Sequence, residues 1–209
     1  MFELEIDILS YWLAGTGRGS GGSFDEKPLL DENGIPYIPG KHLKGLLKDG
    51  LRKWESITGA ENPSAHIHCF GSDQDNENKE DNNKTKSTTG ALRVSSATFD
   101  SATYEGLKTH PKLISKLFKS LSSTAINENG VATNKSLRTI QVVIPVKLYA
   151  QIDWVSASPY ASEEVKEKIE TYLQQASAML PAIGSKRTRG LGRCKIALKK
   201  QNNGGNSNV

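Results

Sequence analysis

A stretch from Ile140 to Trp154, in which every even-numbered residue is apolar, constrains the fold more than any other feature of the sequence. Successive side chains of a β-strand point to opposite faces of a sheet, so this alternation predicts one long strand with a single buried face. The first residues of the chain show the same period, with Phe2, Leu4, Ile6 and Ile8 alternating with Glu3, Glu5 and Asp7. Both segments therefore predict strands that are half buried.

Two further segments carry the period of an amphipathic helix. The first is expected from about Lys41 to Ser56, and its apolar face consists of Leu43, Leu46, Leu47, Leu51, Trp54 and Ile57. The second is expected to begin at Ser158-Pro159, because proline suits the first helical position, and to end before Pro181. Its apolar face consists of Val165, Ile169, Tyr172, Leu173, Ala176, Met179 and Leu180.

The remaining regular segments are a strand from Ala91 to Thr98, a short helix around Pro111 to Leu121, and a closing strand that carries Cys194, Ile196 and Leu198. The whole order is strand, helix, strand, helix, long strand, helix, strand. This order fits an antiparallel sheet with helices on one face. The sequence therefore predicts an α+β fold with a ferredoxin-like (RRM-like) core.

Three polar segments are expected to lie outside this core, in line with a hydrophobic content of 36% and an aromatic content of 7%. Residues 72–89 contain no aliphatic side chain and are predicted to be a disordered insertion. Residues 122–139 have Asn129-Gly130 at their centre, a pair that suits a tight turn, and are predicted to form a projecting hairpin. Residues 201–209 are predicted to be a disordered tail, which leaves one domain over residues 1–200.

The net charge of +4 and the pI near 8.9 permit binding to nucleic acid without requiring it. Five carboxylates lie between Asp73 and Asp81, so the rest of the chain is more basic than the total indicates. Cys69 and Cys194 are too few for a disulfide framework and suit a reducing compartment. The sequence has no signal-peptide pattern and no apolar run of about 18 residues. We therefore expect a cytoplasmic protein with no membrane partner.

A first glycine-rich loop follows the opening strand and includes Gly15, Gly17, Arg18 and Gly19. A dinucleotide-binding fingerprint needs a helix directly after such glycines, whereas a polar segment and a turn follow here. A Walker A loop needs a lysine, which Gly22-Ser23-Phe24 lacks. Neither nucleotide motif fits. The loop is instead expected to be flexible, so that Arg18 and backbone N–H groups can approach a polyanion.

A second glycine-rich loop carries four cations among three glycines: Lys186, Arg187, Arg189 and Arg193 among Gly184, Gly190 and Gly192. Glycines let backbone N–H groups approach phosphate oxygens, and the cations supply a salt-dependent attraction. Because the arginines sit on a loop and not on a recognition helix, single-stranded nucleic acid suits this loop better than a duplex. A solvated turn is the alternative.

The first helix carries a basic stripe that consists of Lys41, Lys44, Lys48 and Arg52. Such a stripe is either a solvated helix face or, beside the N–H groups of a helix start, a phosphate-binding surface. His42 lies at the same helix start and is either a contact to nucleic acid or simply exposed.

The order of these motifs resembles the RAMP superfamily, the repeat-associated proteins of type III CRISPR effectors. The matching motifs are Gly15-x-Gly17, Asp25, Asp31-x-x-Gly34, Ile38-Pro39-Gly40-Lys41-x-Leu43-Lys44-Gly45, Phe70-Gly71-Ser72 and Gly184 through Gly192. Within the superfamily the chain resembles most the backbone subunit that polymerises along the CRISPR guide RNA. The resemblance implies guide RNA and target RNA as partners, and a helical assembly with copies of itself and other RAMP subunits. It also implies that Thr124 to Thr133 forms a thumb-like hairpin.

The resemblance further implies that basic and glycine-rich segments grip the guide RNA. Residues at matching motif positions are Lys41, Lys44, Lys186, Arg187, Arg189 and, more loosely, Arg18. From their places in the helix stripe and the second loop, His42, Lys48, Arg52 and Arg193 are also predicted to bind RNA. No aromatic RNP signature is present, so the sequence does not support base stacking on the sheet.

Backbone subunits that cleave target RNA carry an aspartate before the Pro-Gly segment, and Asp25 matches it by its spacing to Asp31 and Gly34. One carboxylate can hold a divalent metal, Mg²⁺ or Mn²⁺, or help position a ribose 2′-hydroxyl for attack on the adjacent phosphate. The alternatives are that Asp25 is only a turn or cap residue, or that neighbouring Glu26 is the equivalent residue. A non-catalytic structural RAMP subunit therefore stays open.

His66-x-His68-Cys69 has the residue types of a zinc site, but a structural zinc usually needs four ligands and Cys194 is distant in sequence. No structural zinc is expected. A second rival function is a metal-independent RAMP endonuclease that uses a histidine to process precursor CRISPR RNA. That family also has a late glycine-rich loop, but it does not usually carry the Pro-Gly-x-x-Leu-Lys-Gly segment.

Overall fold

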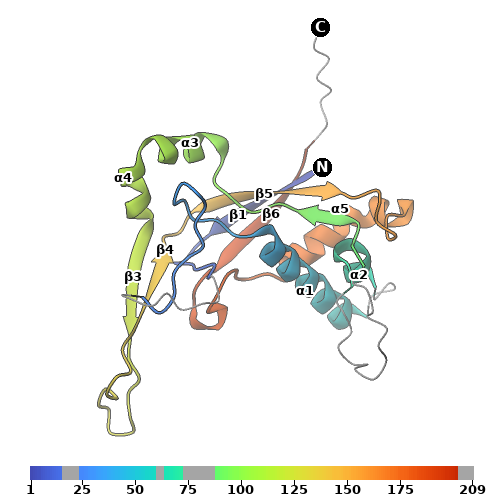
Figure 1. Cartoon of the computed structure of the whole chain (residues 1–209). Helices are drawn as coiled ribbons and strands as arrows, with labels where there is room; N and C mark the ends of the chain where they lie inside the picture. The colour runs from blue at the N-terminus through green and yellow to red at the C-terminus, as the bar shows by residue number, and fades with distance from the viewer. Residues whose placement is uncertain (16–23, 60–63, 73–87, 202–209) are drawn as a thin grey trace, which may run out of the picture.

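The computed structural model describes residues 1–15, 24–59, 64–72 and 88–201 (Figure 1). Its centre is an antiparallel sheet with the strand order β2-β5-β1-β6. These strands are β1 (Phe2–Ile8), β2 (Leu92–Val94), β5 (Lys147–Trp154) and β6 (Cys194–Lys200). β1 thus lies between β5 and β6, and β2 pairs with β5. If the four strands are numbered 1 to 4 in chain order, their order in the sheet is 2-3-1-4. This is the ferredoxin-like order, so the predicted α+β fold class is confirmed.

The alternation of β1 places its apolar residues on one face of the sheet. Leu4 lies opposite Ala150 of β5 and Leu198 of β6, and Leu4 and Ile6 are fully buried. The acidic residues between them lie on the other face, where they are only half buried. A period of two therefore builds a two-sided sheet with one apolar layer.

Helices α1 (Gly40–Thr58) and α5 (Glu163–Ala178) cover the apolar face of the sheet, with the short helix α2 (Ala65–Phe70) beside them (Figure 1). Gly50 of α1 allows the two long helices to approach closely, because a Cβ there would lie 2.5 Å from the carbonyl oxygen of Ala176. The leucines of α1 are buried as predicted. Ile57, however, is 73% exposed, because the last turn of α1 extends past the core.

The predicted start of the last helix is wrong. Ser158 and Pro159 form a turn instead, and the Ser158 hydroxyl donates a hydrogen bond to the carbonyl oxygen of Thr89. The helix begins at Glu163, where the hydroxyl of Ser162 accepts a hydrogen bond from the N–H of Val165. The start of the helix is thus set by a side-chain cap at Ser162 and not, as expected, by Pro159.

The predicted long strand from Ile140 to Trp154 is also wrong as a single element. It divides into β4 (Arg138–Val143) and β5, which belong to different sheets. Pro145 lies between the two strands, and Val142 and Val143 are both fully buried, so the alternation of faces breaks there. Proline cannot donate a ladder hydrogen bond, which explains why the pairing changes at this point.

β4 pairs with β3 (Phe118–Ser123) in an antiparallel hairpin that projects from the sheet (Figure 1). The predicted projecting hairpin is therefore present, joined by residues 124–137. The helix predicted around Pro111 to Leu121 is wrong in extent. It consists of α4 (Pro111–Ile114) and a 3-10 turn, η1 (Ser115–Leu117), before β3 begins.

Two smaller differences from the predicted elements are a shorter strand and an additional helix. The strand expected from Ala91 to Thr98 is regular only in β2, although Ala97 and Thr98 make isolated bridges to Ile38 and Tyr149. Helix α3 (Ser101–Thr109) was not expected. Its N-terminus is capped by Asp100, whose carboxylate accepts a hydrogen bond from the N–H of Thr103.

Several predictions concern segments outside the described residues. These are most of the polar insertion (73–87), most of the first glycine-rich loop (16–23, with Gly17, Arg18 and Gly19) and the tail (202–209). No helix within the described ranges is long and apolar enough to cross a membrane.

Candidate functional site

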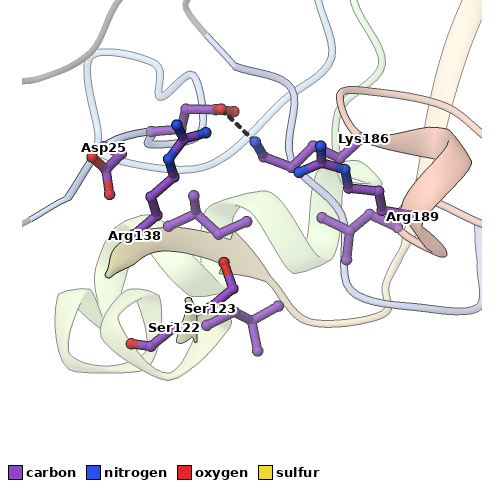
Figure 2. A pocket seen from close by; sticks show the side chains of 10 residues that line it. Asp25, Ser122, Ser123, Arg138, Lys186 and Arg189 are labelled. Carbon is purple, nitrogen blue, oxygen red and sulfur yellow. Dashed lines mark hydrogen bonds and ion pairs between the residues drawn. The ribbon is translucent and has the colours of Figure 1, made fainter. Parts of the chain in front are cut away.

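Three segments that are distant in sequence meet in one cleft with a volume of about 610 Å³. They are the end of the first loop, the ends of β3 and β4 next to their connecting residues 124–137, and the second glycine-rich loop with its 3-10 turn η2 (Arg187–Arg189). The lining residues are Asp25, Glu26, Leu121, Ser122, Ser123, Arg138, Ile140, Lys186, Arg189 and Leu191. Figure 2 shows the labelled polar side chains around the cleft. A cleft of this volume is large enough for a small-molecule-sized part of a ligand.

Asp25 is exposed and is fixed to the edge of the hairpin. Its N–H donates to the carbonyl oxygen of Thr139 at 2.8 Å, and its carboxylate oxygen Oδ2 accepts from the N–H of Thr139 at 2.7 Å. No described residue donates a hydrogen bond to the second oxygen, Oδ1. Asp25 is therefore a capping residue of β4, as one sequence interpretation held, and its side chain is exposed at the cleft.

Glu26 has a different role from its neighbour. Its carbonyl oxygen accepts the N–H of Gln141 at 2.9 Å, which adds this part of the first loop to β4 as a short parallel bridge. Its carboxylate oxygen Oε1 lies 2.6 Å from the Lys186 Nζ, in an ion pair that joins the first loop to the second.

The cleft holds more positive than negative charge. Its lining includes the cations Arg138, Lys186 and Arg189 against the carboxylates of Asp25 and Glu26. Within the described part of the chain, neither arginine makes an ion pair. Arg138 comes from β4 and Arg189 from η2, so the two guanidinium groups approach the cleft from separate elements (Figure 2). Uncompensated arginines in a cleft are suited to bind an anion such as phosphate.

Two glycines of the second loop allow its backbone to approach neighbouring backbone more closely than a side chain would permit. A Cβ at Gly192 would lie 1.8 Å from the carbonyl oxygen of Ile183, and one at Gly184 would lie 2.6 Å from that of Leu13. Both glycines also have a positive φ. Gly190 has open space around its Cβ position. The loop is thus held against the segment that follows β1, and its cations are carried by a fixed backbone.

The basic stripe of α1 begins next to this loop. The pKa of His42 is lowered by burial and by the charge of Arg187, so the helix start and the second loop are neighbours. The pKa of Lys44 is also lowered, by burial and then by Lys48, while Lys41 is exposed. Farther along, Arg52 pairs with Asp49 at 3.0 Å. The first turn of α1 therefore extends the positive surface, whereas Arg52 is directed to a carboxylate of its own helix.

The His66-x-His68-Cys69 segment forms part of α2. His66 Nδ1 lies 2.5 Å from the buried carboxylate of Glu55, and the ring of His68 packs on Tyr160. Burial raises the pKa of the Cys69 thiol to about 12. These side chains hold α2 against α1 and the turn before α5. Across the described ranges, no three His, Cys, Asp or Glu side chains lie close enough together to hold a metal ion.

Sequence reasoning missed Arg138, Leu121, Ser122 and Ser123. They lie in or beside a polar stretch that predicted only a projecting loop, and nothing local indicated that they would line one cleft with the second glycine-rich loop. The usable signal was the position of Arg138, an arginine directly before the strongest alternating segment of the chain.

The fold and the cleft define a ferredoxin-like domain with an inserted β-hairpin whose strands line one cleft with a basic, glycine-rich loop. The sequence profile of the RAMP superfamily matches residues 5–195, and the chain belongs to this superfamily. No curated protein matches the chain.

Solved structures share the fold at low sequence identity. A chain of type III-B Cmr-beta bound to cognate target RNA aligns with a TM-score of 0.66 and 12% identity, covering 95% of this chain and 97% of that one. The apo state of type III-B Cmr-beta gives the same TM-score and identity over 96% and 97%. A chain of a type IV-B CRISPR complex aligns with a TM-score of 0.53 and 14% identity over 95% and 90%.

Proposed function

We propose that this chain is a subunit of a CRISPR ribonucleoprotein effector and binds guide RNA in the cleft between the hairpin and the second glycine-rich loop. Membership of the RAMP superfamily and the shared fold with chains of type III-B and type IV-B CRISPR assemblies support this class. The observation that carries the proposal is the convergence of Arg138, Lys186 and Arg189 on one cleft.

The cations act on the RNA backbone. Loop arginines and lysines bind phosphate oxygens without reading a sequence, as a subunit that carries many different guides must do. His42 and Lys41 continue the surface past Arg187, so an extended strand can pass from the cleft to the start of α1. The assembly proposed with this role consists of copies of the chain and other RAMP subunits along one guide, with target RNA paired to it.

Cleavage of target RNA at Asp25 is the finer part of the proposal. Asp25 is exposed and lines the same cleft as Arg138, and a carboxylate there orients a ribose 2′-hydroxyl for attack on the adjacent phosphate while Arg138 stabilises the developing negative charge. Asp25 would supply the protein oxygen for Mg²⁺ or Mn²⁺, since Mg²⁺ is commonly held by one or two carboxylates, with phosphates and water as its other ligands. Such an ion would supply Lewis-acid polarisation of the phosphate.

The metal-independent endonuclease is the weaker candidate. It needs a histidine at the reacting phosphate, and the described residues that line the cleft include none. His66 is engaged by Glu55, and burial lowers the pKa of His42, which disfavours the protonated form needed as an acid.

Sequencing the RNA that co-purifies with the chain from its own cells tests the binding proposal. A population of RNAs sharing a repeat-derived end and differing in the guide segment is expected. Isolation of the chain without RNA, or with random cellular RNA alone, contradicts the proposal.

Cleavage of a guide-matched target by the purified assembly tests the catalytic part. Wild-type assembly is expected to cut in Mg²⁺ and to stop in EDTA, and Asp25→Asn is expected to abolish cutting while guide content stays unchanged. Cutting of repeat RNA in EDTA would favour the endonuclease. Unchanged target cleavage by Asp25→Asn would favour the non-catalytic subunit.

A further inference from the structure

We infer that the carboxylate of Glu26 occupies a phosphate-binding position in the RNA-free chain, and that an RNA phosphate displaces it from Lys186. This inference rests on the proposed function. It assigns Glu26 a competitive role and gives Lys186, Arg138 and Arg189 a shared ligand, a single backbone phosphate.

The charges of the cleft support a shared anion site. Among the described residues that line the cleft, three are cations and two are carboxylates. The Oδ2 of Asp25 accepts the N–H of Thr139, whereas Glu26 is paired with a cation of the cleft, Lys186, so that among the described ion pairs the one with Glu26 is the one an anion would have to displace. A phosphate carries its charge on several oxygens and can contact cations on two sides of the cleft at once. The carboxylate of Glu26 is paired with Lys186 alone among the described cations of the cleft.

The ion pair between Glu26 and Lys186 is suited to exchange. The two side chains are 36% and 24% exposed, and partly solvated pairs contribute little net stability because water screens them and competes for both groups. Replacement of the carboxylate by phosphate therefore costs the fold little.

The backbone of Glu26 does not have to move in this exchange. Its carbonyl oxygen is held by the N–H of Gln141, and its bridge to Ile140 keeps it beside β4. Rotation of the side chain alone removes the carboxylate from Lys186. The cations are likewise carried by fixed elements, Arg138 by β4 and Arg189 by η2, so the phosphate position remains when the carboxylate leaves.

The apolar part of the lining strengthens the site. Leu121, Ile140 and Leu191 lie among the charged side chains, so part of the cleft wall does not hydrate the cations. Attraction between a phosphate and these cations is stronger there than on an open surface, because the effective dielectric constant is lower.

The inference predicts changes of opposite sign. Glu26→Gln removes the competitor and is expected to tighten binding of a fluorescent single-stranded oligouridylate by about three- to tenfold. Arg138→Gln is expected to weaken it about tenfold and to lower the slope of log K against log salt by about 0.7, the contribution of one phosphate contact in a single strand. A folding defect cannot tighten binding, so Glu26→Gln is informative even if other variants are unstable.

The test is fluorescence anisotropy on the full chain stripped of RNA in high salt, with two matched controls. Glu163→Gln removes an exposed, lysine-paired carboxylate of α5, and Arg93→Gln removes an exposed arginine of β2. In the background of Lys186→Gln, the gain from Glu26→Gln is expected to disappear.

Three outcomes overturn the inference. The first is binding by Glu26→Gln that is no tighter than binding by Glu163→Gln. The second is a gain that persists in the Lys186→Gln background, as a general charge effect does. The third is equal binding by Arg138→Gln and Arg93→Gln. In the first two cases wild-type binding leaves the proposed function standing, and in the third it leaves RNA binding standing but removes Arg138 from the binding site. Absence of binding by the wild-type chain removes the proposed function and the inference with it.

Discussion

The cleft and the outer face of the sheet both carry lysines or arginines beside carboxylates, but they balance these charges differently. The outer face is the one that α1 and α5 do not cover. There the carboxylate of Glu5 in β1 is paired with both Lys147 and Lys199, and its Oε1 lies 2.6 Å from the Lys147 Nζ. In the cleft, Arg138 and Arg189 make no ion pair with a described residue. The difference teaches that the number of basic residues on a surface does not identify an anion site. What identifies it is the positive charge that the protein leaves uncompensated.

The largest expected effect separates the two surfaces by RNA affinity. Arg138→Gln combined with Arg189→Gln is expected to weaken binding of single-stranded RNA by roughly 30- to 100-fold, because two phosphate contacts are lost. Lys147→Gln combined with Lys199→Gln removes the same charge from the outer face and is expected to change affinity by less than about twofold. Anisotropy titrations measure both, and equal losses would break the distinction between the surfaces.

A second prediction separates the charge of Asp25 from its capping role. Asp25→Asn keeps an oxygen that accepts the N–H of Thr139, so the fold is expected to stay intact while target cleavage falls at least about a hundredfold. Asp25→Ala is expected to lose the same activity and, in addition, about 1 kcal/mol of stability.

Urea unfolding and cleavage by the assembled complex measure the two effects. Glu5→Gln is the control on the outer face and is expected to leave cleavage unchanged. Equal stability of Asp25→Ala and wild type would contradict the capping role.

The smallest expected effect concerns the outer face alone. Hydrogen bonds from Lys147 and then Lys199 lower the pKa of Glu5 from 4.5 to about 2. A carboxyl group with a depressed pKa stabilises the fold above its unfolded value and loses this contribution as the pH falls through the folded value. The contribution of Glu5 is therefore complete above pH 4.5 and lost progressively toward pH 2.

Denaturant midpoints measured across this interval are expected to fall less steeply for Glu5→Gln than for wild type. RNA binding at neutral pH is expected to be the same for both. Parallel pH profiles would show that the outer-face pairs do not hold Glu5 ionised.

The sequence predicted the layers of the fold better than the ends of its elements. The periods of β1, α1 and α5 follow from which side chains the sheet and helices bury, and these are strong local signals. The division of the Ile140–Trp154 segment depends on Pro145 and on pairing with β3, which is a tertiary contact. The last helix begins at the Ser162 cap and not at the expected proline. That cap is a local hydrogen bond, but the apolar periodicity from which the helix was predicted does not indicate it.

The sequence indicated several residues of the candidate cleft by their type, but it did not predict how they are arranged in space. Lys186, Arg189 and Asp25 were named from their loops, and they lie in one cleft. Arg138 was not named, because its position opposite the second loop arises only when the hairpin folds. Glu26 was considered as a substitute for Asp25, whereas its side chain contacts Lys186 across a long sequence separation. Patterns within a segment cannot contain such contacts.

Ultraviolet crosslinking of the RNA-bound chain, purified from its own cells and mapped by mass spectrometry, tests the central claim most directly. Crosslinked peptides are expected to contain the start of β4 around Arg138 and the second loop around Lys186 to Leu191. Crosslinks confined to the outer face of the sheet, along β1, β5 and β6, would contradict it.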